Sequence, residues 1–200
     1  MTSPVPLVFW TILALGPIPI WHLLLHAGLP FWKRHPRAFY GAAAAVWALF
    51  LPLSQHLAAR SSPLFVATGG VKLLCLGTGI VSFLVALWSI KTLTPSRFFL
   101  WAVLRPREHP PVLIRRGPYR FTAHPTYVAM IVAVASSFLA SGEVVLLGAC
   151  GAMALLLTLV ATLEQQELRA RLSGSFASSP DRAPAAAALA PLAMGTDDGE

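Results

Sequence analysis

The chain is poor in charged residues and in cysteine, and both shortages limit the kinds of protein it can be. Only 12% of its 200 residues are charged, whereas 56% are hydrophobic. A soluble domain of this length would need an implausibly large core to bury so many apolar side chains. The two cysteines, Cys75 and Cys150, both fall inside apolar segments and lack the spacing of metal ligands. We expect them to be small core residues rather than parts of a disulfide or zinc site.

Several motifs of well-known enzymes are also missing. The sequence contains no Walker loop, no dinucleotide-binding fingerprint, no zinc-ligand spacing and no arrangement typical of a Ser/His/Asp hydrolase. The net charge of +7 raises the question of nucleic-acid binding. The distribution of the basic residues favours membrane topology instead, so we expect no nucleic-acid partner and no metal site.

The apolar residues are gathered in five segments, each close to the length of a bilayer crossing, for which roughly 20 residues are needed. These expected spans cover residues 5–27, 38–59, 64–90, 126–141 and 144–163. The first lacks the basic start of a signal peptide and continues into further spans, so we interpret it as a membrane helix. Pro17 and Pro19 should kink or break it near its middle. The predicted fold class is an all-α integral membrane protein with about five transmembrane helices and a C-terminal helical hairpin.

The basic residues predict the orientation of these spans. Of the 15 lysines and arginines, all except Arg60 and Lys72 lie in the connections after the first and third spans or beyond the fifth. By the positive-inside rule the N-terminus is outside and the C-terminus is in the cytoplasm, in the plasma or inner membrane. The cytoplasmic arginines also suit anionic membrane lipids. Lys72, inside the third span, either snorkels outward or has a function, and its role stays open.

We expect two regions, a membrane domain over residues 1–176 and a disordered cytoplasmic tail over residues 177–200. The tail is rich in Ser, Ala, Pro and Asp and shows no apolar periodicity.

A polar segment at residues 117–127, directly before the fourth span, is the first candidate for chemistry. Pro125 suits the first turn of a helix, where its missing N–H costs nothing, and His124 then takes the N-cap position. The free N–H groups of that first turn, together with the helix dipole, form a site for a small anion such as a carboxylate.

Glu164, at the end of the fifth span, is the second candidate. At about 1.5 Å per residue the two legs of the predicted hairpin are roughly 25 and 30 Å long, which returns Glu164 to about the depth of His124. The helix dipole disfavours a carboxylate at a C-terminal end, so a facing cation or donor would explain it. The alternative is a solvated helix end in which Glu164 and Glu167 pair with Arg171 or with loop arginines.

These residues carry a family resemblance. Gly117-Pro118-Tyr119-Arg120, His124-Pro125 and Tyr127, followed by Glu164-Gln165-Gln166-Glu167-Leu168, resemble the signature of the isoprenylcysteine carboxyl methyltransferase and phospholipid methyltransferase superfamily. The stretch Trp88-Ser89-Ile90-Lys91-Thr92-Leu93 is similar to the one that ends the third span in that family. The resemblance covers about residues 70–176. It implies a membrane methyltransferase with S-adenosylmethionine as cofactor and a lipid-linked or apolar acceptor, either isoprenylcysteine carboxylate-like or phospholipid-like.

The resemblance also implies roles for individual residues. The cofactor-binding residues would be Tyr119, His124, Pro125, Tyr127 and Glu164. Arg120 would be the catalytic residue that orients an acidic acceptor.

Other interpretations stay open. The family usually has Arg immediately before His-Pro and a second acid after the first, whereas this chain has Ala123 and Gln165. An alternative is therefore a catalytically silent relative that acts as a membrane scaffold or partner protein. His22 and His26 share a helix face and are candidates for metal or haem coordination, although polar residues near a helix end are also common there.

Overall fold

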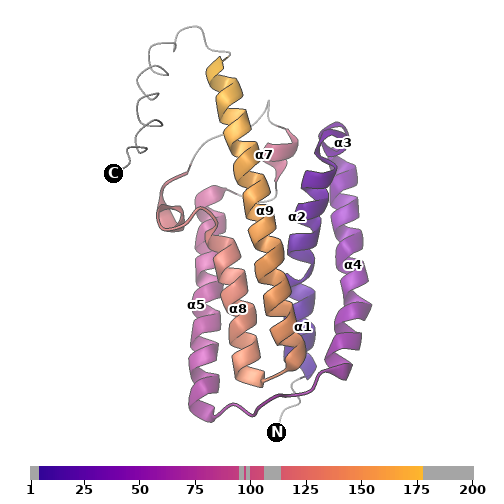
Figure 1. Cartoon of the computed structure of the whole chain (residues 1–200), viewed down its shortest axis with the longest axis vertical. Helices are drawn as coiled ribbons and strands as arrows, with labels where there is room; N and C mark the ends of the chain where they lie inside the picture. Colours follow the sequence, from indigo (N-terminus) through magenta and orange to yellow (C-terminus); the bar gives the residue numbers. More distant parts are fainter. Residues whose placement is uncertain (1–4, 95–96, 98–99, 106–113, 178–200) are drawn as a thin grey trace, which may run out of the picture. The chain divides into compact units, whose positions relative to one another are not determined.

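The computed structural model describes residues 5–94, 97, 100–105 and 114–177, with the backbone alone at 102 and 171–177. Over these residues the chain is helical and has no strand, and a single isolated β-bridge joins Pro63 to Glu143. The elements are α1 (Val5–Leu15), α2 (Pro17–Ala27), α3 (Leu29–Arg34), α4 (Pro36–Arg60), α5 (Gly69–Leu93), α7 (Trp101–Leu104), the 3-10 helix η1 (Gly117–Arg120), α8 (Pro125–Ser141) and α9 (Val144–Ala177) (Figure 1). The predicted all-α class is confirmed. The tail expected after residue 176 lies outside the described residues from 178 onward.

Membrane-length apolar helices account for most of the chain. Within the described residues, four segments are long and apolar enough to cross a membrane, namely Val5–Ala27, Pro36–Arg60, Gly69–Leu93 and Val144–Ala170. The fifth expected span, α8, has 17 residues. At about 1.5 Å per residue it measures roughly 25 Å, slightly less than the hydrocarbon core of about 30 Å. The protein is therefore a multi-pass integral membrane protein.

The first span breaks where its prolines predict. α1 ends at Leu15 and α2 begins at Pro17, with Gly16 between them. A Cβ at Gly16 would lie 2.5 Å from Cε1 of Phe50 on α4, so the glycine permits close approach of that ring.

The expected start of the third span at residue 64 is wrong. α5 begins at Gly69, and the side chain of Thr68 caps it by accepting a hydrogen bond from the Val71 amide. Residues 61–68 are not helical because part of their backbone pairs with the turn between α8 and α9. The Leu64 amide donates to the Gly142 carbonyl at 2.9 Å, and the Val144 amide donates to the Ser62 carbonyl at 3.1 Å.

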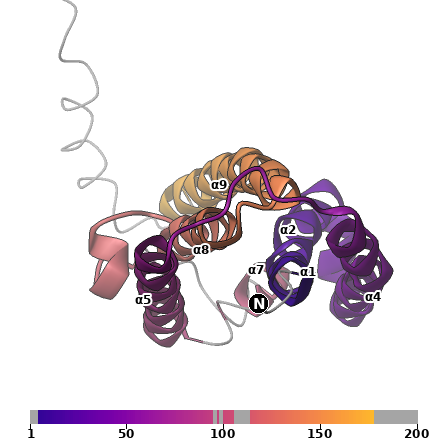
Figure 2. The same cartoon turned by 90° about the horizontal axis from the view of Figure 1, so that it is seen from below.

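The chain divides into two compact units, residues 1–162 and 163–200. In the first unit α8 packs against α5 on one side and α1 on the other, while α4 packs against α1 and α2 (Figure 2). The first part of α9 belongs to this unit, and its Met153 and Leu157 pack against Met130 and Val134 of α8. In the second unit the described residues are the last turns of α9, which carry Glu164.

The long connection between α5 and η1 contributes to the core. Leu100 and Leu104 are buried in one cluster with Leu25 of α2 and Phe39 of α4. The Arg105 guanidinium lies 4.6 Å from the ring centroid of Trp101. This stretch therefore ties the connection to the N-terminal helices.

Candidate functional site

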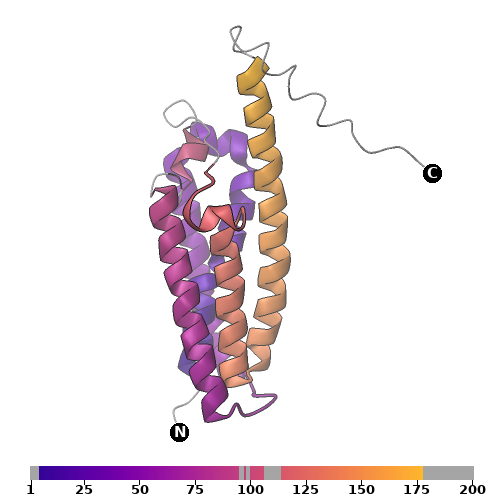
Figure 3. The same ribbon diagram turned by 90° about the vertical axis from the view of Figure 1, so that its left-hand side faces the viewer.

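The 3-10 helix η1 packs against the last turns of α5 (Figure 3). Gly117 has a φ of +57°, and a Cβ there would lie 2.8 Å from Oγ1 of Thr92 and 3.3 Å from Nε1 of Trp88. Both the backbone conformation and the lack of space require glycine. The structure thus brings together two stretches that the sequence singled out separately, the end of the third span and the start of the Gly-Pro-Tyr-Arg segment.

The start of α8 has the predicted arrangement. Pro125 is the first helical residue and His124 is the N-cap, with its carbonyl accepting from the amides of Tyr127 and Val128 at 3.1 and 3.2 Å. The His124 side chain makes no capping hydrogen bond. Its own amide donates to Oγ1 of Thr122 at 3.4 Å. The His124 imidazole therefore does not cap the helix.

The His124 imidazole belongs to a group of aromatic rings at the start of α8, formed by His124, Tyr127 and His22. The rings of His124 and Tyr127 are stacked, with centroids 5.1 Å apart and planes 5° apart. His22 of α2 meets Tyr127 edge-on at 5.7 Å. These contacts place α2 beside the polar segment and bring two histidines into contact with Tyr127.

His22 is the residue that sequence reasoning did not assign to this site. It is only 7% exposed, and its Nδ1 donates to the Ile18 carbonyl at 2.9 Å, since a carbonyl can only accept. Among the described residues, no group of three or more His, Cys, Asp or Glu side chains is arranged to hold a metal ion. The one signal in the sequence was the position of His22 near the end of the first span, at the expected depth of Tyr127.

Thr126 supplies a buried polar group in the first turn of α8. Its side chain is 6% exposed, and Oγ1 has no hydrogen-bond partner among the residues that the structure describes. A buried hydroxyl without a partner costs about 1–3 kcal/mol. Its place next to the Thr126 backbone amide at the helix N-terminus fits an anionic group that would accept from both.

The remaining predicted site residues lie on two elements, η1 and α9. Tyr119 and Arg120 lie on η1, with Arg120 exposed and its guanidinium 5.1 Å from the ring centroid of Phe121. Pro118, between Gly117 and Tyr119, is buried. Glu164 belongs to the second unit, and its pairing with the start of α8 stays a prediction.

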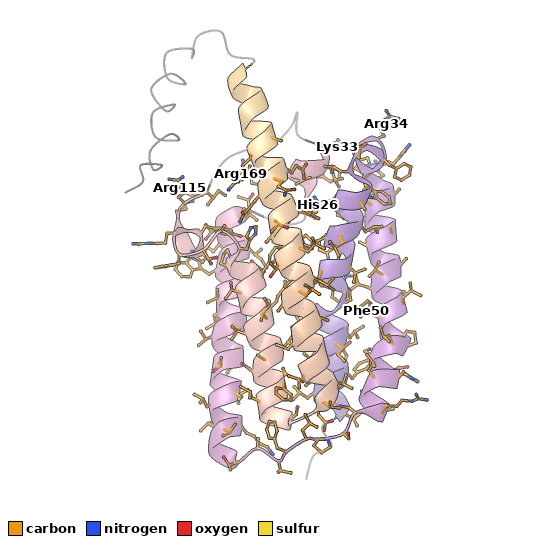
Figure 4. All side chains as sticks on the ribbon, in the orientation of Figure 1. His26, Lys33, Arg34, Phe50, Arg115 and Arg169 are labelled. Carbon is orange, nitrogen blue, oxygen red and sulfur yellow. The ribbon has the colours of Figure 1, made fainter. Side chains whose placement is uncertain are left out.

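An apolar cavity of about 370 Å³ lies in the first unit, between α1, α2, α4, α8 and the first part of α9. Its lining includes Gly16, Ile20, Phe50, Val134, Gly148 and Met153. Figure 4 shows Phe50 on the side of α4 that faces α1 and α2. The lining hydroxyl of Thr11 donates to Ser137 at 3.3 Å, so the cavity offers almost pure hydrocarbon to an occupant. Pro19, which also lines the cavity, lies three residues before His22 on α2, so the two residues share a helix face.

Membrane-length helices and a polar His-Pro group at the start of one of them define the class, a helical membrane protein with a site at a helix end. The profile of the phospholipid methyltransferase family matches residues 69–172, more than half of the chain, and the chain belongs to this family. The family resemblance seen in the sequence is confirmed. The match begins with α5 and leaves α1 to α4 outside it. No curated protein and no solved structure matches the chain.

Proposed function

We propose that the protein is a membrane methyltransferase that uses S-adenosylmethionine, as its family does, and transfers a methyl group to a lipid-linked or apolar acceptor. The observation that carries this proposal is the start of α8, where the stacked pair of His124 and Tyr127 lies next to the buried hydroxyl of Thr126. These residues fall inside the part of the chain that matches the family.

The residues present fit the chemical groups of this cofactor. The carboxylate suits the backbone amide and the hydroxyl of Thr126, since Pro125 has no N–H and the amides of Tyr127 and Val128 donate to the His124 carbonyl. The ring faces of His124 and Tyr127 suit an aromatic base or a sulfonium. Tyr119 and Pro125 would complete the wall of the site on either side of His124, and the carboxylate of Glu164 would meet the cationic groups.

When bound, the cofactor supplies an electrophilic methyl group on a sulfonium. The protein's part is to align that methyl group with the acceptor and to exclude water, and such positioning can supply much of the rate. Arg120 would orient a phosphate or carboxylate on the acceptor through its guanidinium. The apolar cavity supports an acceptor with a hydrocarbon part, because its size is that of a small-molecule site.

Binding of labelled S-adenosylmethionine to the purified protein tests the proposal. We expect saturable binding that weakens at least about tenfold in His124→Ala and in Glu164→Ala, the loss expected when a contact worth about 1.4 kcal/mol is removed. His56→Ala is the matched control, since His56 is exposed on α4 and lies outside the proposed site. An unmodified protein without saturable binding would overturn the proposal.

The alternative function, a catalytically silent relative acting as a scaffold, is favoured by Ala123 and Gln165. Both positions are exposed, so an arginine and a glutamate can be accommodated there without disturbing the core. Methyl transfer to prenylcysteine, phosphatidylethanolamine and small thiols should be measured in the unmodified protein and in Ala123→Arg/Gln165→Glu. Cofactor binding without transfer in the unmodified protein, with transfer gained in the double variant, would establish the silent relative.

The orientation with the N-terminus outside and the site in the cytoplasm is also part of this proposal. Single cysteines at Arg60 and Arg115, both exposed, would report it in a Cys75→Ser/Cys150→Ser background. A membrane-impermeant maleimide should label position 60 in intact cells and position 115 only after permeabilisation. The reverse pattern would place the site on the outer face.

A further inference from the structure

A second cavity, of about 240 Å³, lies at the C-terminal end of α5. It is lined by Thr92, Leu93 and Thr94 from the end of the helix and by Arg97, Arg115 and Arg116 from the connection that follows. Arg115, labelled in Figure 4, lies in the segment that leads into η1. The cavity is smaller than the roughly 300–1,000 Å³ of ordinary ligand pockets, which suits a single head group.

The three arginines have no partner of opposite charge within the described part of the chain. None of them forms an ion pair with another described residue. Three like charges around one small cavity repel one another, so an anion between them is favoured. Guanidinium groups bind phosphate through two parallel hydrogen bonds, which makes a phosphate the best match for this set.

The surroundings indicate that the phosphate belongs to a lipid. α5 is one of the four helices able to cross a membrane, and Ile80, Leu84 and Leu87 are exposed along it. Trp88, half exposed, lies one turn before Thr92, where tryptophan is typical of a membrane interface. Acyl chains lying along this apolar face would bring their phosphate to the end of the helix, where the arginines are.

This place differs from that of the proposed acceptor. α8 lies between α5 and α1 (Figure 2), and the apolar cavity is on the α1 side of α8. The arginine cavity is formed by the end of α5 and the residues that precede η1. The two cavities therefore share no lining residue.

We propose that Arg97, Arg115 and Arg116 bind the phosphate of an anionic membrane phospholipid. Arg97 follows α5 and Arg116 directly precedes Gly117, so a shared phosphate ties the end of α5 to η1. The bound lipid would thereby hold in place the short helix that carries Tyr119 and Arg120. This site does not depend on methyl transfer, because it requires only the lipid and the three arginines.

Native mass spectrometry of the full-length protein in detergent, titrated with phosphatidylglycerol or phosphatidylcholine, tests this site. We expect a saturable phosphatidylglycerol site with at least tenfold preference over phosphatidylcholine. In Arg97→Gln/Arg115→Gln/Arg116→Gln its affinity should fall by about 100-fold, since each basic residue contributes about fivefold near an anionic lipid. The control Lys33→Gln/Arg34→Gln/Arg37→Gln removes the same charge from another connection and should bind like the unmodified protein.

Three outcomes would overturn the proposal. One is equal phosphatidylglycerol affinity in the unmodified protein and the arginine variant. Another is an equal loss in the control variant, which would show general charge attraction only. The third is full competition by millimolar inorganic phosphate with no advantage for the lipid, which would mark a site for soluble anions. Helical content and the unfolding midpoint, measured on each variant, separate loss of binding from loss of folding, and Arg116→Gln alone should still weaken binding about fivefold.

Discussion

The imidazole of His124 lies almost parallel to the phenol ring of Tyr127, with centroids 5.1 Å apart and planes 5° apart. His124 is the N-cap of α8 and Tyr127 lies in the first turn of that helix. The ring of His22 lies nearly perpendicular to the phenol ring, with centroids 5.7 Å apart. Tyr127 is therefore positioned by α8 and α2 together, although only α8 lies in the part of the chain that matches the family.

The Tyr127 ring should matter more than its hydroxyl for cofactor binding. We expect Tyr127→Phe to keep the stack and change the dissociation constant of S-adenosylmethionine less than about threefold. Tyr127→Ala should weaken binding about tenfold, because an aromatic contact contributes about 0.5–1.5 kcal/mol beyond the buried area. Isothermal titration calorimetry on both variants measures the difference. An equal loss in both would show that the hydroxyl, and not the ring, contacts the ligand.

Thr126→Val tests two effects of the buried Thr126 hydroxyl, its cost to folding stability and its contribution to cofactor binding. Valine keeps the shape of threonine and removes Oγ1, which has no partner among the described residues. Without cofactor the variant should be more stable by about 1 kcal/mol, because an unsatisfied hydroxyl is no longer buried. With cofactor it should bind about tenfold more weakly, because a donor to the carboxylate is lost. Unfolding in detergent mixtures measures the stability, and titration with S-adenosylmethionine measures the affinity. A Thr126→Val variant that is less stable than the unmodified protein without cofactor would contradict this account.

Local chemistry explains why part of this structure was predictable. The break before Pro17 and the start of α8 at Pro125, with His124 as N-cap, follow from the conformations that proline allows, which depend on no distant residue. The long apolar segments likewise predict membrane helices by length alone.

The unpredicted features all depend on contacts between distant segments. The late start of α5 depends on the backbone hydrogen bonds of Ser62 and Leu64 to the turn between α8 and α9. The role of His22 depends on α2 lying beside α8, and the requirement for Gly117 depends on the Thr92 side chain. Periodicity and local preference contain no information on such contacts, since each is fixed only when the helices pack.

Gly142 is the glycine in the α8–α9 turn that should tolerate no side chain. Its φ is +76°, and a Cβ there would lie 2.1 Å from the Phe65 carbonyl oxygen. Gly142→Ala should lower the free energy of unfolding by more than about 2 kcal/mol, because strain in the left-handed region adds to the clash. Gly151→Ala is the control, since a Cβ at that helical position meets no atom within 4 Å. Unfolding in mixed detergent micelles compares the two; similar stability in both variants would show that the turn adjusts easily.

Ser61→Ala tests a buried carboxyl group at the opposite end of α8 from His124. Glu143 is 1% exposed, and the Ser61 hydroxyl donates to its Oε2 at 2.6 Å, while Oε1 has no hydrogen-bond partner within the described residues. Removing the hydroxyl leaves the carboxyl group without its side-chain donor, so we expect a loss of about 1–3 kcal/mol in the free energy of unfolding.

Two further variants decide whether the loss of stability in Ser61→Ala comes from breaking the hydrogen bond between Ser61 and Glu143. Ser54→Ala removes a buried hydroxyl that donates to the Leu51 carbonyl within its own helix, and should cost less than Ser61→Ala. Ser61→Ala/Glu143→Met replaces both partners by apolar groups of similar shape, and should recover most of the loss, because no polar group is then left unsatisfied. If the double variant is less stable than Ser61→Ala, the carboxyl group stabilises the turn through contacts other than Ser61.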